Sequence, residues 1–236
     1  MLMVFVTNAQ QKSYYTGLYF EGIQTYSTGL YGIELKQRNQ DLAEDFKSKG
    51  YTAKGDVTPR LGVGFGAFYG KYFSDQFVME TSLGLAQRGY TEHLSYEYGN
   101  DTASVSYFSN AEVKLNYLDW NIGVRYLNQY GWSIYCGAIY GINFYDRVDY
   151  DFEHSVTVLD STEVLGSTHK NIYFHEYYGG ANRNIYLPGY TLGLGYHYGR
   201  FELNAVIKQQ LGLFYKDARE QNLFSVNANL KIYIVQ

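Results

Sequence analysis

Residues 201–215, FELNAVIKQQLGLFY, alternate apolar and polar side chains almost without a break. A period of two places one set of side chains on each face of a β-strand and does not fit the period of a helix. The run is also far longer than the roughly five or six residues of a typical strand of a soluble protein. Two explanations follow: a long strand of a soluble sheet with one wet face, or a membrane-spanning strand with lipid on its apolar side and a polar lumen on the other.

The same alternation recurs along the chain and indicates eight strands. They cover approximately residues 14–26, 60–70, 77–88, 112–126, 132–144, 190–198, 201–213 and 224–234. The phase of the alternation changes within 112–126, and a β-bulge near Tyr117 and Leu118 would restore the register. Short turns follow the second, fourth and sixth strands, whereas the other connections are mostly long. This arrangement predicts an all-β, eight-stranded antiparallel up-and-down transmembrane barrel, with short periplasmic turns, long extracellular loops and both termini periplasmic.

Composition narrows the class of protein. The chain has 28 Tyr, 14 Phe and 25 Gly but only 2 Pro, and its mean hydropathy is -0.32. No run of about 18 apolar residues predicts a membrane helix. A soluble lipocalin-type barrel also has eight strands, but it would line its interior with apolar residues, whereas here the second face carries charge. We therefore favour a barrel in the outer membrane of a Gram-negative bacterium.

Charge and metal-ligand patterns exclude other classes. Nineteen Lys and Arg against 23 Asp and Glu give a net charge of -4 without a basic cluster, which argues against nucleic-acid binding. The single Cys136 excludes an internal disulfide. The five histidines share no metal-ligand spacing. The sequence therefore predicts no metal and no cofactor.

The N-terminus resembles the end of a secretory signal. A short apolar run, Leu2 to Val6, precedes the small-residue pattern Thr7-Asn8-Ala9. We expect residues 1–9 to be a signal-peptide remnant and residues 10–236 to form one barrel domain. An ordinary first strand is the alternative interpretation.

Two segments resemble a known family. LGVGFGAFYGKYFSDQFVMETSLGLAQRGY, residues 61–90, and VKLNYLDWNIGVRY, residues 113–126, resemble the PorT-like outer-membrane β-barrel family of Bacteroidota. The sequence departs from that family at Trp120-Asn121, where Ile-Pro is common, and at its last residues, where many barrels end in an aromatic. The resemblance implies the barrel fold and an outer-membrane location. It also implies a role as an accessory part of a secretion or envelope-assembly machine.

Charged residues on the polar faces of the predicted strands define the candidate lumen. The predicted polar network consists of Glu21, Arg60, Glu80, Arg88, Glu112, Lys114, Arg125, Glu202, Lys208 and Lys231. An eight-stranded barrel is just wide enough for its own side chains, and unpaired buried charges are costly. We therefore expect these residues to pair as a plug; a proton or solute path is the alternative. The glycines of GVGFG face inward in this register and leave room for large lumen side chains.

The long loops supply a second candidate surface. Residues 36–50 predict a short helix that Asn39 caps and Gly50 ends. The predicted contact surface consists of Leu42, Phe46, Ile172, Tyr173, Phe174, Tyr177 and Tyr178. Tyrosine-rich surfaces are typical of binding sites. The alternative is that these tyrosines pack against neighbouring hairpins.

These observations predict a non-enzymatic barrel without catalytic residues. We expect it to be an accessory subunit of an envelope complex or a surface-binding scaffold, in contact with outer-membrane lipid and with other outer-membrane or secretion-complex proteins. A stand-alone adhesin or envelope-stabilising barrel is the first alternative. A lipid-modifying enzyme is the second, with Glu92, His93 and Ser95 as its only candidate neighbourhood. Neighbouring residues on a strand alternate between faces, which argues against this group.

Overall fold

The computed structural model describes residues 14–100, 102–158, 161–173, 186–212 and 222–235. The predicted signal-peptide remnant, residues 1–9, lies outside these ranges. Within them, no helix is both long enough and apolar enough to cross a membrane.

Eight antiparallel strands close into a ring. They are β1 (Tyr14–Thr28), β2 (Thr52–Tyr72), β3 (Phe77–Asn100), β4 (Ala103–Leu127), β5 (Trp132–Val158), β7 (Tyr186–Tyr198), β8 (Phe201–Gln210) and β9 (Asn222–Val235). Each strand pairs with the next in this order, and β9 closes the ring on β1, with Thr28 opposite Asn222. The predicted eight-stranded up-and-down barrel is confirmed.

Short turns gather at one end of the ring, which we call the hairpin end. It contains the turns at 73–76, 128–131 and 199–200, together with the start of β1 and the end of β9. Gly131 and Gly199 have φ angles of 89° and 60°, a left-handed conformation that suits glycine in a tight turn.

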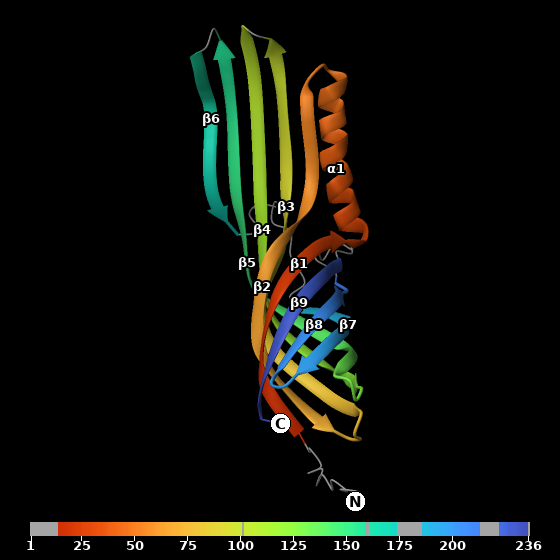
Figure 1. The fold of residues 1–236 in the computed structure, drawn as a ribbon. Coiled ribbons are helices and arrows are strands. Elements are labelled where there is room, and N and C mark those ends of the chain that lie inside the picture. Colours follow the sequence, from red (N-terminus) through yellow and green to blue (C-terminus); the bar gives the residue numbers. More distant parts are fainter. Residues whose placement is uncertain (1–13, 101, 159–160, 174–185, 213–221, 236) are drawn as a thin grey trace, which may run out of the picture.

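A sheet continues beyond the opposite end of the ring. β2 to β5 are 21, 24, 25 and 27 residues long, far more than the ring requires. β5 pairs with β7 only as far as Ile142, and from Val148 it pairs with β6 (Ser161–Ile172). We call residues 52–59, 90–100, 103–113 and 146–158, together with β6, the projecting sheet (Figure 1). Much of the sequence predicted to be loop is therefore paired strand.

Helix α1 (Gly29–Ser48) stands beside the projecting sheet (Figure 1). It is longer than predicted, and Asn39 is not its cap but a buried mid-helix residue. Leu35, Asn39 and Ala43 are buried at a spacing of four residues and form the inward face. A Cβ atom on Gly55 of β2 would lie only 1.9 Å from the Asn39 carbonyl oxygen, so glycine at this position lets the helix approach. As expected, Gly50 follows the helix end, with φ 89°.

The predicted phase change in β4 has a different cause. Val113, Leu115 and Tyr117 are buried on the same alternating face as Asp119, so β4 keeps one phase. The register shift between Asn116 and Tyr117 belongs to its pairing with β5, where Phe144 is the extra residue. The interior lining itself changes from polar within the ring to apolar near the projecting sheet.

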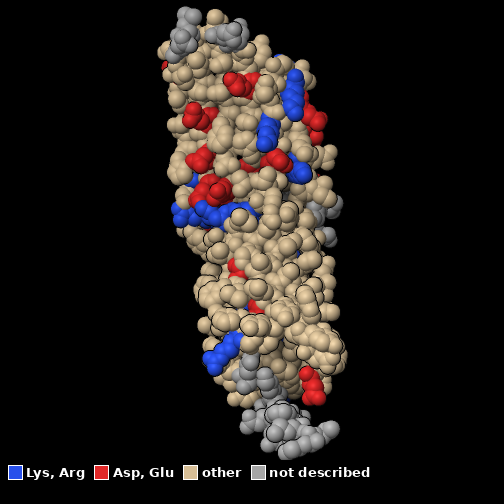
Figure 2. Space-filling view, viewed as in Figure 1, with Lys and Arg blue, Asp and Glu red and all other residues tan. Residues whose placement is uncertain are grey.

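The outer wall of the ring is apolar. Its outward side chains include Leu61 and Val63 of β2, exposed at 75% and 68%, and Leu203 of β8, exposed at 66%. In Figure 2 charged side chains gather on the upper half of the visible face, whereas the lower half shows few of them. We call this surface of the ring the apolar belt.

Candidate functional site: the barrel interior and the outer wall

The ring encloses equal numbers of acidic and basic side chains. Among the described residues, its four buried carboxylates are Glu21, Glu80, Asp119 and Glu202, and its four buried cations are Arg88, Arg125, Lys208 and Lys231. Burying an unpaired charge is costly. Equal numbers of acidic and basic side chains allow every charge in the narrow lumen to have a partner of opposite sign.

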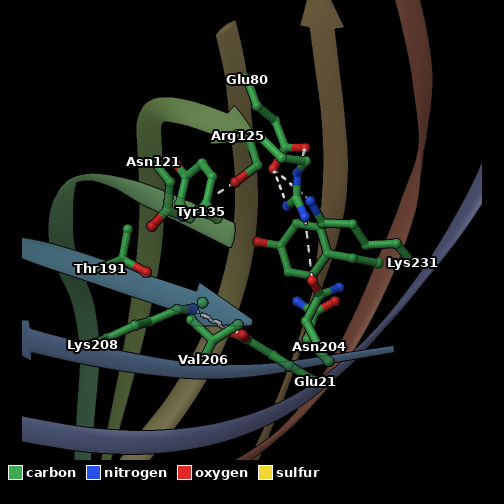
Figure 3. Close-up of a pocket in the computed structure, with 14 residues that line it drawn as sticks. Glu21, Glu80, Asn121, Arg125, Tyr135, Thr191, Asn204, Val206, Lys208 and Lys231 are labelled. Atoms are coloured by element: carbon green, nitrogen blue, oxygen red, sulfur yellow. Dashed lines mark hydrogen bonds and ion pairs between the residues drawn. The ribbon is translucent and has the colours of Figure 1, made fainter. Parts of the chain in front are cut away.

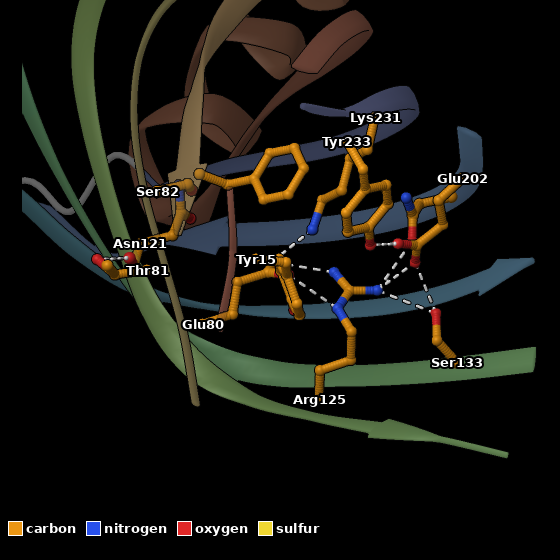
Figure 4. A network of polar contacts seen from close by, with 12 residues as sticks. Tyr15, Glu80, Thr81, Ser82, Asn121, Arg125, Ser133, Glu202, Lys231 and Tyr233 are labelled. Carbon is orange, nitrogen blue, oxygen red and sulfur yellow. Dashed lines mark hydrogen bonds and ion pairs between the residues drawn. The ribbon is translucent and has the colours of Figure 1, made fainter. Parts of the chain in front are cut away.

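Arg125 of β4 organises the half of the interior near the hairpin end (Figure 4). Its guanidinium donates from Nε to Glu80 Oε2 at 2.9 Å and from Nη2 to Glu80 Oε1 at 3.0 Å. Its Nη1 bonds Glu202 and donates to Ser133 Oγ at 2.9 Å. Lys231 supplies a second cation to Glu80. The fork of the guanidinium thus joins two carboxylates from opposite sides of the ring.

Two tyrosines complete the coordination of these carboxylates. Tyr15 Oη donates to Glu80 Oε2 at 2.8 Å, and Tyr233 Oη donates to Glu202. The alternation predicted that acidic and basic residues face inward. It did not indicate that aromatic residues on the same strands would supply hydrogen bonds.

A second group of charges lies nearer the projecting sheet. Lys208 Nζ donates to both oxygens of Glu21, at 2.9 and 2.8 Å, and Asn227 Nδ2 donates to Glu21 Oε2 at 3.0 Å. Arg88 forms a two-pronged pair with Asp119, and Lys208 Nζ is 3.9 Å from Asp119 Oδ2. Asp119 was absent from the predicted set, although it lies on the same face of β4 as the inward Asn121 and Arg125.

Inward glycines of β2 make room for these side chains. A Cβ atom on Gly64 would lie 2.7 Å from Glu21 Oε1, and one on Gly70 would lie 2.2 Å from the Tyr15 ring. The packing role expected for the glycine-rich stretch agrees with these contacts.

A small polar cavity of about 40 Å³ lies between the two groups of charges. Figure 3 shows Glu21 and Lys208 on one side of it and Glu80 and Arg125 on the other. This volume holds about three water molecules, which is too little for a continuous aqueous pore.

Apolar clusters flank the charged interior at both ends. At the hairpin end, the cluster consists of Tyr15, Tyr19, Phe68, Val78 and Tyr233. Toward the projecting sheet, the cluster consists of Leu35, Tyr90, Ala111, Val113, Leu115, Tyr117, Val148, Leu187 and Leu223. Leu35 comes from α1, so the helix forms part of the second closure. The polar lumen is therefore packed between two apolar layers.

Comparisons with known proteins identify the family to which this chain belongs. The sequence matches the family model described as "Outer membrane protein beta-barrel domain" over residues 37–214. The chain belongs to this family. The family implies a location in the outer membrane of a Gram-negative bacterium. A search of curated proteins finds no match.

Solved outer-membrane barrels resemble the chain at low sequence identity. Ail of Yersinia pestis shares 10% identity at a TM-score of 0.40, covering 94% of this chain and 99% of Ail. Neisserial surface protein A shares 9% identity at a TM-score of 0.40, covering 93% of this chain and 96% of that protein. OprG of Pseudomonas aeruginosa shares 10% identity at a TM-score of 0.38, covering 95% of this chain and 97% of OprG.

Three residues of the predicted lumen network lie elsewhere on the outer-membrane barrel. Glu112 and Lys114 alternate with the buried Val113 and Leu115, so they lie on the outer wall. Arg60 lies at the register shift of β2 against β3, and its Nε is 3.6 Å from Glu112. Glu112 and Lys114 were wrongly assigned to the lumen because β4 keeps one phase, and Arg60 was wrongly assigned because the pairing of β2 shifts between Pro59 and Gly64.

These three residues belong to an ionic cluster on the outer wall. Lys114 Nζ is 3.4 Å from Glu112 Oε2 and also pairs with Asp149 of β5. Arg147 Nε lies 3.4 Å from Asp149 Oδ1. Burial raises the pKa of Asp149, but its hydrogen bond and ion pair with Lys114 outweigh burial and hold the pKa below its usual value. We call Arg60, Glu112, Lys114, Arg147 and Asp149 the belt-edge cluster.

The four described residues of the predicted loop contact surface lie in different surroundings. Leu42 is exposed on α1, whereas Phe46 stacks on Tyr96 with a ring-centroid distance of 4.1 Å. Ile172 packs against the apolar cluster near the projecting sheet, and Tyr173 is exposed. Phe174, Tyr177 and Tyr178 lie outside the described residues.

The candidate enzymatic neighbourhood is not assembled. Glu92 is buried and pairs with Arg38 of α1 at 3.2 Å. His93 follows it on the strand and contacts the Phe108 ring on the other face of the sheet. Burial, followed by the charge of Lys54, lowers the pKa of His93. Among the described residues, no group of three or more His, Cys, Asp or Glu side chains could hold a metal ion.

Proposed function

We propose that this outer-membrane barrel is a non-conducting anchor that holds the projecting sheet and α1 outside the cell as a binding surface for another envelope protein. The sealed lumen carries this proposal. Four carboxylates pair with four cations, and apolar clusters cover both ends. A lumen packed in this way leaves the surface, and not the interior, for function.

The orientation follows from the arrangement of connections. Outer-membrane barrels have short turns on the periplasmic side and longer segments on the outside. We infer that the hairpin end, with both ends of the barrel domain, lies in the periplasm. The projecting sheet then lies outside the cell.

The free edge of the projecting sheet is the best candidate for partner binding. Among the described residues, β6 pairs only with β5, and most of its side chains are exposed. Val164 and Leu165 are apolar yet exposed at 52% and 56%, beside a register shift. An exposed strand edge can accept a strand from another chain. The resemblance to PorT-like proteins supports a partner within a secretion or envelope-assembly complex.

Affinity purification from native outer membranes in mild detergent tests this proposal. We expect a stoichiometric partner with the wild-type barrel, retained by the variant S161K/T162K and lost from V164K/L165K. The first variant adds the same charge to the same strand but leaves both apolar side chains in place. Recovery of the wild-type barrel alone would contradict a complex subunit. The stand-alone adhesin would then be the better account, with binding to a surface outside the cell as its readout.

A further inference from the structure

The belt-edge cluster lies where the apolar belt ends. On β2, Arg60 is followed by Leu61, exposed at 75%. On β5, Phe144, exposed at 58%, lies just below Arg147. On β4, Trp120 lies farther down the belt from Lys114, exposed at 51% and opposite Tyr140 of β5. Since the belt faces lipid tails in a membrane barrel, the cluster lies at the depth of the lipid headgroups.

The cluster occupies only one side of the barrel. Every charged side chain on the described parts of β1, β7, β8 and β9 is buried in the lumen: Glu21, Glu202, Lys208 and Lys231. The belt edge on that side carries Tyr186 and Leu211 instead. Among the described strands of the ring, exposed charge at this edge of the belt therefore lies on the wall formed by β2 to β5.

The composition of the cluster favours an anionic ligand. Arg60, Lys114 and Arg147 outnumber Glu112 and Asp149 by one. Arg60 and Arg147 lie 3.6 and 3.4 Å from their carboxylates, longer than a good hydrogen bond. Arg147 is exposed at 43% and Arg60 at 19%, and Arg60 Nη1 also donates to Gln87 Oε1 at 3.1 Å. A guanidinium carries five N–H donors and binds phosphate through two of them at once. Both arginines can therefore donate hydrogen bonds to a phosphate while they keep their present partners.

We propose that the belt-edge cluster binds the phosphorylated headgroup of a membrane lipid on the projecting-sheet side of the bilayer. Arg60 and Arg147 contact the phosphate, and Lys114 supplies a third cation between them. Identifying that lipid as an outer-leaflet phosphorylated glycolipid rests on the orientation given under the proposed function. The binding site itself does not depend on the orientation.

Titration of the detergent-solubilised full chain with lipid A, a bisphosphorylated glycolipid, tests this site, with bound lipid counted by native mass spectrometry. We expect R60Q/K114Q/R147Q to bind at least about tenfold more weakly, because one lost charged hydrogen bond is worth about 1.5–3 kcal/mol. The control K36Q/K47Q/K49Q removes three exposed cations, two from α1 and one from the residue that follows it, and is expected to bind within about twofold of wild type. Equal binding by R60Q/K114Q/R147Q and wild type would overturn the proposal.

A second variant gives a result of opposite sign. E112Q/D149N removes the carboxylates that compete with phosphate, so we expect it to bind lipid A more tightly than wild type. A purely structural ion-pair cluster predicts no gain, and unchanged or weaker binding by a folded E112Q/D149N barrel would count against the site. Folding of every variant is checked by the gel-mobility shift between unheated and heated samples.

Two further ligands identify the recognised chemistry. Dephosphorylated lipid A is expected to bind about tenfold more weakly than lipid A, because it lacks the charged hydrogen bonds. Inorganic phosphate at millimolar concentration is expected not to displace lipid A, and efficient displacement would overturn the assignment to a lipid. These measurements do not involve the partner of β6, so failure of the partner experiment leaves this result intact, and the reverse also holds.

Discussion

Arg125 is the residue on which the charge balance of the lumen depends most directly. Replacing it in Arg125→Leu would leave Glu80 and Glu202 without their guanidinium. We expect the free energy of unfolding to fall by about 3–5 kcal/mol, the usual effect of removing one partner from a buried ion pair. Urea unfolding in lipid vesicles, followed by tryptophan fluorescence, measures this change.

The matched control is Lys49→Leu. Lys49 pairs with Asp45 on the surface of α1, and both side chains are more than half exposed, so its removal is expected to cost less than about 1 kcal/mol. An Arg125→Leu midpoint equal to that of the control would show that the buried network does not stabilise the barrel.

Glu21 and Lys208 allow a test of pairing itself. Lys208→Met removes the cation bound to both oxygens of Glu21 and leaves a buried carboxylate with less compensation. The double variant Glu21→Leu/Lys208→Met removes both charges, so we expect it to be more stable than Lys208→Met by about 1–3 kcal/mol. Additive losses in a double-mutant cycle of urea unfolding would contradict direct pairing.

His169 of β6 is the residue with a testable pH response. Its hydrogen bond and ion pair with Asp151 of β5 raise its pKa. A raised pKa means that the protonated form stabilises the pairing of the two strands. This contribution is complete below the ordinary histidine pKa of about 6.5 and is lost as the pH rises through the raised value.

An NMR titration of His169 checks this effect. We expect Asp151→Asn to lower the pKa of His169 toward its ordinary value. An identical His169 titration in wild type and Asp151→Asn would exclude the ion pair in solution.

At the residue scale, sequence reasoning worked where side chains alternate within the ring. Glu80 and Arg88 of β3 and Lys208 of β8 have buried side chains, as their positions on the polar faces suggested. Glu112 and Lys114 were misplaced because their apolar neighbours on β4 look like residues that face lipid. Those neighbours, Val113 and Leu115, in fact line the part of the interior that is apolar. Predicting this from the sequence would require knowing where along β4 the polar part of the lumen ends.

At the element scale, docking of α1 on β2 depends on close approach at Gly55. A side chain in Gly55→Leu would collide with the backbone of the helix at Asn39. We expect α1 to separate from the sheet and become sensitive to trypsin, while the barrel keeps its heat-dependent gel shift. Limited proteolysis of the folded protein, followed by mass spectrometry, measures this.

Gly22→Leu is the control for this substitution. No atom lies within 4 Å of a Cβ placed at Gly22 of β1, so the same change is expected to leave α1 protected. If Gly55→Leu is as resistant to trypsin as Gly22→Leu, the helix does not depend on this contact.

The elements of the ring could be predicted from the sequence, but the projecting sheet could not. Within the ring, lipid-facing and lumen-facing residues differ sharply, as in β8. Beyond the ring, aromatic residues such as Tyr96 and Tyr107 stack on one face of the sheet. Neither face there contacts lipid, so apolar and polar residues no longer alternate regularly along the sequence. The start of α1 also has no signature, because the hydroxyl of Thr28 bonds the Asn222 carbonyl and not the helix.

At the scale of the whole molecule, one ring of strands serves two environments. The ring of β1 to β5 and β7 to β9 presents an apolar belt outside and a balanced charge network inside. Four of its strands continue into the projecting sheet, where α1 and β6 extend the surface (Figure 1). Because these strands are continuous, the sealed ring holds the projecting sheet in a fixed position relative to the membrane.

The conductance of the purified wild-type barrel in planar lipid bilayers shows whether its lumen is sealed. A sealed lumen predicts no stepwise conductance across about ±100 mV, since a cavity of about 40 Å³ between two apolar clusters holds only a few waters. A pore-forming barrel inserted in the same way confirms that the method detects open channels, and protease protection confirms insertion. Stable, reproducible conductance steps from the inserted wild-type protein would contradict the sealed lumen and the role as a non-conducting anchor.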